Sequence, residues 1–129
     1  MRNKAISFLT RDEVLEIHKL LIARFGGKSG VTDLGLLESA LYRPKTGYYK
    51  EVIEMSAALF ESLIMNNPFV DGNKRVAFFA TDIFLRLNGY KFKVKPTETY
   101  DYLIGLLSSG NCTYENLLPW LRKSVVSAD

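Results

Sequence analysis

The segment from residue 67 to residue 75 gathers residue types that bind phosphate. It reads Asn-Pro-Phe-Val-Asp-Gly-Asn-Lys-Arg. Gly72 lets the backbone approach a ligand closely, and the first N–H groups of a helix that starts there lack internal partners and favour an anion. Lys74 and Arg75 add two cations, which oppose the helix dipole at this end unless an anion lies among them. The spacing therefore predicts an anion-binding turn.

Asp71 brings a carboxylate into this cationic segment. A carboxylate is a poor phosphate contact but a good ligand for Mg²⁺, which proteins bind through carboxylate and phosphate oxygens. A simpler interpretation makes Asp71 the N-cap of the next helix and leaves Lys74 and Arg75 solvated. From these residues alone, both interpretations stay open.

Two helices are expected to hold the turn. Apolar residues recur at helical spacing over residues 51–66, and Pro68 forces residue 67 out of helical geometry. The same spacing returns from Val76 to Leu87, and Gly89 supplies a left-handed helix cap. Because position 67 continues the inner stripe of the first helix, its side chain should point toward the turn.

The segment resembles the signature of the Fic/Doc family, His-Pro-Phe-x-(Asp/Glu)-Gly-Asn-(Gly/Lys)-Arg, at eight of its nine positions. The version with Lys74 resembles that of the Doc (death-on-curing) branch, whose members are toxins of toxin–antitoxin pairs. The resemblance implies a cytoplasmic protein kinase that moves the γ-phosphate of ATP onto a threonine of elongation factor Tu and so inhibits translation. The Fic branch instead transfers a nucleotide monophosphate, and Lys74 favours phosphoryl transfer.

The resemblance also implies roles for individual residues. Asp71 would hold Mg²⁺ on the phosphates of ATP. Gly72, Asn73 and Lys74 would surround the phosphates with backbone N–H groups and the Lys74 ammonium. Arg75 would bind terminal phosphate oxygens, for which its planar fork is suited. Positioning and electrostatics of this kind supply most of the catalysis in phosphoryl transfer.

Asn67 departs from the signature, because the family has at this position a histidine that acts as general base. An asparagine amide does not take up a proton near neutral pH, and loss of a general base typically costs ~10² to 10⁴ in rate. The sole histidine, His18, lies far away in sequence and is interpreted as a surface or packing residue. The chain is therefore predicted to be inactive or strongly impaired as an enzyme.

Two explanations for Asn67 compete: natural loss of catalysis, or a deliberate change that inactivates a toxin. The second is favoured because the rest of the signature is intact. Two classes of function follow, a Doc-type kinase lacking its base and a non-catalytic protein that binds nucleotide or antitoxin. Protein nucleotidyl transfer (AMPylation) is a further alternative to phosphoryl transfer.

The resemblance implies macromolecular partners as well. The loop of residues 43–49 corresponds to a flap that docks the target protein, through Lys45, Tyr48 and Tyr49, although such a loop is as often a packed turn. Asn111 replaces the Ser or Thr of the inhibitory pattern that many Fic proteins carry in their own chain. Inhibition is therefore expected from a separate antitoxin, through a helix laid into a groove.

Composition limits the remaining classes of function. A chain of 129 residues, 47% of them hydrophobic, predicts one domain over residues 1–129 with a proper core. Cys112 is the sole cysteine, which excludes an intrachain disulfide and suits the cytoplasm. The sequence shows neither a signal peptide nor a membrane span. The net charge of +3 is mild, so we do not expect nucleic-acid binding.

The expected fold is an all-α, compact helical bundle of the Fic/Doc type. Capping boxes, turns and apolar spacing place helices after Thr10, after Asp33, over residues 51–66, over residues 73–88, after residue 97 and after Thr113. The stripes expected to face inward are Val14, Ile17, Leu21 and Ile22; Leu34, Leu37 and Leu41; Tyr100, Leu103, Ile104 and Leu107; and Leu117, Leu118 and Leu121. Alternating lysines predict one short extended segment near residues 90–95.

Overall fold

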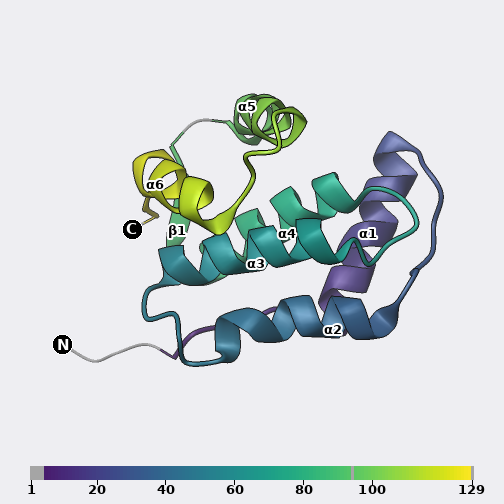
Figure 1. Ribbon diagram of the computed structural model, residues 1–129, viewed down its shortest axis with the longest axis horizontal. Coiled ribbons are helices and arrows are strands. Elements are labelled where there is room, and N and C mark those ends of the chain that lie inside the picture. Colours follow the sequence, from purple (N-terminus) through teal and green to yellow (C-terminus); the bar gives the residue numbers. More distant parts are fainter. Residues whose placement is uncertain (1–4, 94, 129) are drawn as a thin grey trace.

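The computed structural model describes residues 5–93 and 95–128 (Figure 1). Its elements are α1 (Arg11–Phe25), α2 (Leu34–Tyr42), a 3₁₀ turn η1 (Arg43–Lys45), α3 (Val52–Asn66), α4 (Asn73–Leu87), β1 (Tyr90–Phe92), α5 (Pro96–Ser108), α6 (Tyr114–Ser124) and β2 (Val125–Ser127). The predicted all-α architecture is confirmed, since two short strands are the sole strands in the described part of the chain. None of the helices described is long and apolar enough to cross a membrane.

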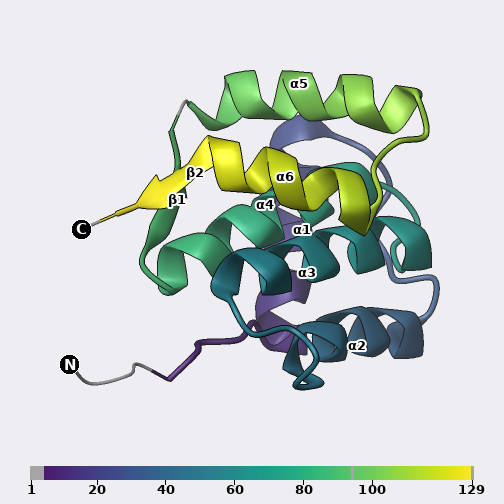
Figure 2. The ribbon, with the colours of Figure 1, turned by 60° about the vertical axis from the view of Figure 1, so that its left-hand side comes forward.

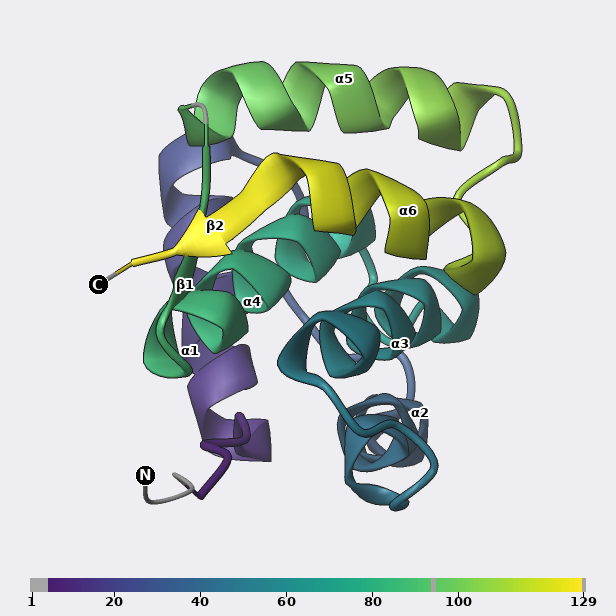
Figure 3. The same ribbon diagram turned by 90° about the vertical axis from the view of Figure 1, so that its left-hand side faces the viewer.

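Helix α3 forms the centre of the bundle. It packs against α4, α2 and α6, which surround it in the end-on view of Figure 3, while α1 packs on α4. Figure 2 shows α5 and α6 as an outer pair above this core. Small residues such as Ala57 and Ala58 let neighbouring helices come close to α3, and Phe60 is fully buried among them. Burial of a phenylalanine of this kind contributes about 1.5–3 kcal/mol.

The helix starts read from the sequence are confirmed by the cap geometry. The Glu13 N–H donates to Thr10 Oγ1 (3.2 Å), and the Thr10 N–H donates to the Glu13 carboxylate (2.8 Å), which completes the capping box. Asp33 caps α2 by accepting from the Leu36 N–H (3.2 Å). The stripe predicted for α2 is wrong at Leu34, which is 40% exposed because it lies in the first turn, outside the contact with α3.

The predicted extended segment near residues 90–95 is found at Tyr90–Phe92, while Val94 lies outside the described residues. β1 pairs antiparallel with β2, and Phe92 faces Val125. Lys91 is exposed and Phe92 is buried, as the alternation predicts. The sequence reading missed β2, which follows α6 directly.

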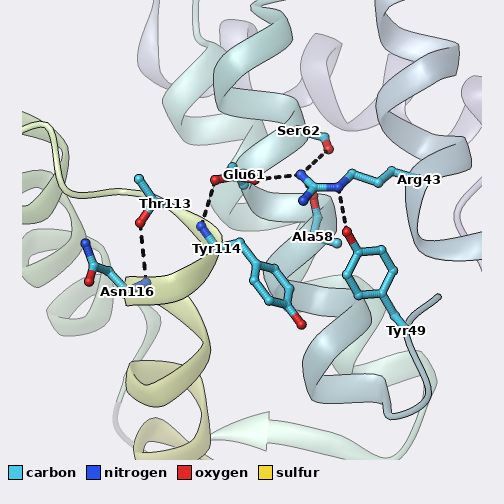
Figure 4. Close-up of polar contacts among 8 residues, drawn as sticks. All are labelled: Arg43, Tyr49, Ala58, Glu61, Ser62, Thr113, Tyr114 and Asn116. Carbon is cyan, nitrogen blue, oxygen red and sulfur yellow. Dashed lines mark hydrogen bonds and ion pairs between the residues drawn. The ribbon is translucent and has the colours of Figure 1, made fainter.

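A polar cluster around Arg43 joins η1, α3 and α6 (Figure 4). Arg43 donates to the Glu61 carboxylate (2.7 Å) and to the Tyr49 hydroxyl (2.9 Å). The second oxygen of Glu61 accepts from the Tyr114 N–H (2.7 Å) at the start of α6. Burial opposes the charge of Arg43, but the hydrogen bonds to Glu61 and Tyr49 outweigh it and raise the pKa of the guanidinium. This cluster fixes α6 and the loop after η1 on α3.

Candidate active site at the turn between α3 and α4

The turn from Asn67 to Gly72 is built by two left-handed residues. Asn67 ends α3 at φ 50° and Gly72 precedes α4 at φ 76°. No side chain caps the start of α4, and its first helical bond runs from the Val76 N–H to the Gly72 carbonyl (2.9 Å). The N–H groups of residues 73–75 therefore have no partner within residues 5–93 and 95–128, as an anion site requires.

Asp71 is not the N-cap of α4, so the simpler sequence interpretation of this residue is wrong. One carboxylate oxygen accepts from the Lys28 N–H (3.1 Å) and the other from the Gly72 N–H (2.9 Å). These backbone hydrogen bonds, the one from Lys28 above all, hold the pKa of Asp71 below its ordinary value. The carboxylate is thus ionised at neutral pH, and it fastens the loop after α1 to the turn.

Asn73 shapes the turn with its side chain. Its amide oxygen accepts from the Phe69 N–H (2.9 Å), and its amide nitrogen donates to the Phe69 carbonyl (2.8 Å). Phe69 is 1% exposed and anchors the turn in the core. The backbone N–H of Asn73, at the uncapped start of α4, remains available to a ligand.

His18 packs against the turn, which confirms the packing interpretation of this residue, although its contact with the turn was not foreseen from the sequence. Its ring is 3% exposed and stacks on the Phe69 ring, with centroids 4.0 Å apart and planes 13° apart. Nε2 lies 2.9 Å from the Asp71 carbonyl oxygen, which can only accept, so Nε2 donates. His18 is a packing residue outside the pocket lining. The one available signal was its spacing of four residues from Val14, which places both on one helix face.

A pocket of about 380 Å³ opens at the turn. Its lining brings together all the predicted catalytic and phosphate-binding positions and adds Val70 and Tyr100: Asn67, Val70, Asp71, Gly72, Asn73, Lys74, Arg75 and Tyr100. Asn67 and Lys74 are exposed, and the Arg75 guanidinium carbon lies 4.3 Å from the centroid of the Phe25 ring. Tyr100 comes from α5, where the sequence suggested only a core residue.

The residues predicted to dock a target do not line this pocket. Lys45 and Tyr48 are exposed, so both are accessible to a partner. Tyr49 is 8% exposed, and its hydroxyl accepts from Arg43. Its side chain is therefore part of the packed turn, the alternative that the sequence left open, while docking of a target by this loop stays a prediction.

Gly27 allows a test of how the loop after α1 supports Asp71. A Cβ at Gly27 (φ 113°) would lie 2.8 Å from an Asp71 carboxylate oxygen, whereas a Cβ at Gly26 (φ 88°) would meet nothing within 4 Å. Both alanine variants should lose about 1–3 kcal/mol of unfolding free energy to backbone strain. Only Gly27→Ala should also displace Asp71 and so weaken, in calorimetry, the Mg·ATP binding that the sequence predicts for this turn. Equal affinities for the two variants would contradict this account.

Comparison with known proteins gives consistent matches. The chain matches the sequence pattern described as the Fic/DOC family over residues 8–85, which contain the whole turn. It is 41% identical over 87 residues to Toxin Doc of Mycolicibacterium smegmatis, a match that spans 64% of this chain and 65% of that protein. It is 29% identical over 125 residues to Protein kinase doc of Escherichia phage P1, across 94% of this chain and 98% of the phage protein.

Proposed function

The chain belongs to the Fic/DOC family, and from this premise we propose that it is a Doc-type toxin built to transfer the γ-phosphate of ATP to a hydroxyl group of a target protein. The observation that carries the proposal is the convergence of residues 71–75 on one pocket with uncapped helix N–H groups. Two cations, Lys74 and Arg75, line the same pocket. The names of the two relatives, a Doc toxin and a Doc protein kinase, support the same activity.

Asp71 is the residue that would hold Mg²⁺. Its ionised carboxylate lines the pocket and has lone pairs beyond the two that accept backbone N–H groups. The described residues contain no group of three or more acidic, histidine or cysteine side chains that could hold a metal ion. Mg²⁺ would therefore take its other ligands from phosphate and water, as it commonly does in nucleotide sites. When bound, the ion would neutralise phosphate charge.

The remaining residues of the turn would position the phosphates. The free N–H groups at the start of α4 and the Lys74 ammonium would surround the phosphate oxygens. The Arg75 fork suits two oxygens at once. Asn67 lies at the pocket where a base would accept the proton of the target hydroxyl, and its amide cannot do so. The chain as it stands would bind ATP and transfer phosphate poorly or not at all.

Asn67 is also the observation that favours a second candidate function, that of a non-catalytic protein that binds nucleotide or antitoxin. In either case we propose an antitoxin as the partner, bound through a helix in a groove. For the active form, the proposed target is a translation elongation factor in the cytoplasm. Nucleotidyl transfer is disfavoured by Lys74, which would fill the space that a second glycine leaves.

Titration calorimetry with Mg·ATP tests the proposal. The chain should bind Mg·ATP, and Arg75→Ala should weaken binding about 10- to 100-fold, because a hydrogen bond to a charged group contributes about 1.5–3 kcal/mol. Arg122→Ala is the matched control, since this arginine lies on α6 outside the pocket and pairs loosely with Glu51 (3.5 Å). Wild-type affinity in Arg75→Ala, or no binding by the wild type, would overturn the proposal.

A further inference from the structure

The Arg75 side chain lies between two aromatic rings from distant parts of the chain. Its guanidinium carbon is 4.3 Å from the centroid of Phe25, the last residue of α1. On α5, the Tyr100 ring centroid is 5.6 Å from the same carbon. A guanidinium within about 6 Å of a ring centroid is attracted by the negative face of the ring. Three separate elements, α1, α4 and α5, therefore meet at this one cation.

Arg75 differs from most arginines of the protein in its partners. Arg11, Arg43, Arg86 and Arg122 each pair with at least one carboxylate. Within residues 5–93 and 95–128, Arg75 makes no ion pair and no side-chain hydrogen bond. A ring face attracts the cation but accepts none of its N–H groups in the way a carboxylate would. The two rings thus hold the Arg75 side chain in place. Its N–H donors and its positive charge remain available to a ligand.

We propose that Phe25 and Tyr100 are positioning residues that hold the Arg75 guanidinium for an anionic phosphate group in the pocket. The proposal rests on the proposed function, because it takes phosphate as the ligand of the site. Tyr100 lines the pocket itself, and Phe25, Arg75 and Tyr100 together line a smaller adjoining hollow of about 110 Å³. A planar fork that is already oriented loses less side-chain freedom when it binds two oxygens.

Helix α5 thereby gains a role in the site through Tyr100. Residue 100 lies beyond the residues 8–85 that match the family pattern. Helix α5 contacts the core through aromatic rings: the Tyr100 ring centroid lies 5.6 Å from that of Phe78 and 6.5 Å from that of Phe79. These contacts fix the Tyr100 ring, so the ring can in turn fix Arg75. Phe25 is 46% exposed, and its interaction with Arg75 gives this exposed ring a function.

Calorimetry with Mg·ATP tests the clamp formed by Phe25 and Tyr100. Phe25→Leu and Tyr100→Leu should each raise Kd about 2- to 5-fold, and the double variant about 5- to 25-fold, from the strength of cation–π contacts. Phe25→Tyr and Tyr100→Phe keep a ring face and should stay within about 2-fold of the wild type. The matched control is Tyr102→Leu, which removes a tyrosine of the same helix that stacks on Trp120 instead.

A second measurement separates the clamp from the proposed function. The ¹⁵N relaxation of the Arg75 side-chain Nε–H group should show greater mobility in the Leu variants than in the wild type and in Tyr102→Leu. This comparison needs no nucleotide, so it tests whether the two rings hold Arg75 even if the wild type fails to bind Mg·ATP. Such a failure would overturn the proposed function alone. Wild-type Kd together with an unchanged Arg75 Nε–H signal in the double variant would overturn the clamp. Phe25→Leu alone, at a half-exposed site, keeps the test decisive if the double variant unfolds.

Discussion

Asn67→His should raise phosphoryl transfer from ATP by about 10²- to 10⁴-fold over the chain as it stands. Position 67 is exposed and lines the pocket beside Asp71 and Arg75, so an imidazole there can reach a hydroxyl group presented to bound ATP. Imidazole takes up a proton near neutral pH, which the asparagine amide cannot do. This is the position at which the family resemblance implies a histidine.

The fold should accept this substitution at almost no cost. Asn67 is the sole non-glycine residue with positive φ in the described part of the chain, at φ 50° and ψ 53°. Asparagine and histidine are both enriched in this left-handed region. We therefore expect Asn67→His to change the unfolding free energy by less than about 0.5 kcal/mol. Asn67→Ala is the matched control: it should lose about 1–2 kcal/mol to left-handed strain and gain no activity.

Label transfer from ATP measures the activity. Each protein is incubated with Mg²⁺, γ- or α-labelled ATP, and either purified elongation factor Tu or a cell lysate. Label transferred only by Asn67→His, and only from the γ position, would identify a kinase that is inactive because of one residue. This is the result expected if Asn67 is a deliberate inactivating change. Transfer from the α position would contradict the argument from Lys74. No transfer by Asn67→His would favour the non-catalytic protein.

Local interactions made much of the fold predictable from the sequence. A cap joins residues about three apart, so the start of α1 at Thr10 and the start of α2 at Asp33 follow from the sequence alone. Pro68 and Gly72 also mark the turn through local effects. Pro68 has a fixed φ and cannot continue the helix, and Gly72 can adopt a positive φ. The sequence could also predict that residues 67 and 71–75 lie together at one pocket, because these residues are close neighbours in the chain.

Contacts between distant residues were out of reach of such reasoning. The ring of His18 meets Phe69, and the clamp joins residues 25, 75 and 100, pairs that no local spacing connects. The strand β2 was missed because a three-residue strand is defined by its partner, here Tyr90–Phe92, more than by its own pattern. Tyr49 was assigned to a target contact from the family resemblance alone. Its burial depends on the hydrogen bond from Arg43, which Glu61 of α3 holds in place, and the sequence does not show this contact.

His18→Ala should destabilise the protein by about 2–4 kcal/mol and weaken Mg·ATP binding. The ring is 3% exposed and stacked on Phe69, so its removal leaves a cavity beneath the turn, and losses of this size are typical for large buried side chains. The Asp71 carbonyl also loses its donor, which lies 2.9 Å away. Since Asp71 and Phe69 belong to the turn, loss of the His18 ring should also loosen the geometry that we propose for phosphate binding.

Two further variants separate packing from hydrogen bonding at this position. His18→Phe keeps a ring against Phe69 but leaves the Asp71 carbonyl without the His18 donor. Because this hydrogen bond is only part-buried, its loss should cost about 0.5–1.5 kcal/mol, less than the loss of the packed ring. Lys19→Ala changes the exposed neighbour on α1 and should stay within about 0.5 kcal/mol of the wild type. Urea unfolding and Mg·ATP calorimetry on the three variants measure both effects. If His18→Ala unfolds at the wild-type urea midpoint, the turn does not depend on His18. If it is destabilised but binds Mg·ATP with wild-type affinity, His18 stabilises the fold without setting the geometry of the site.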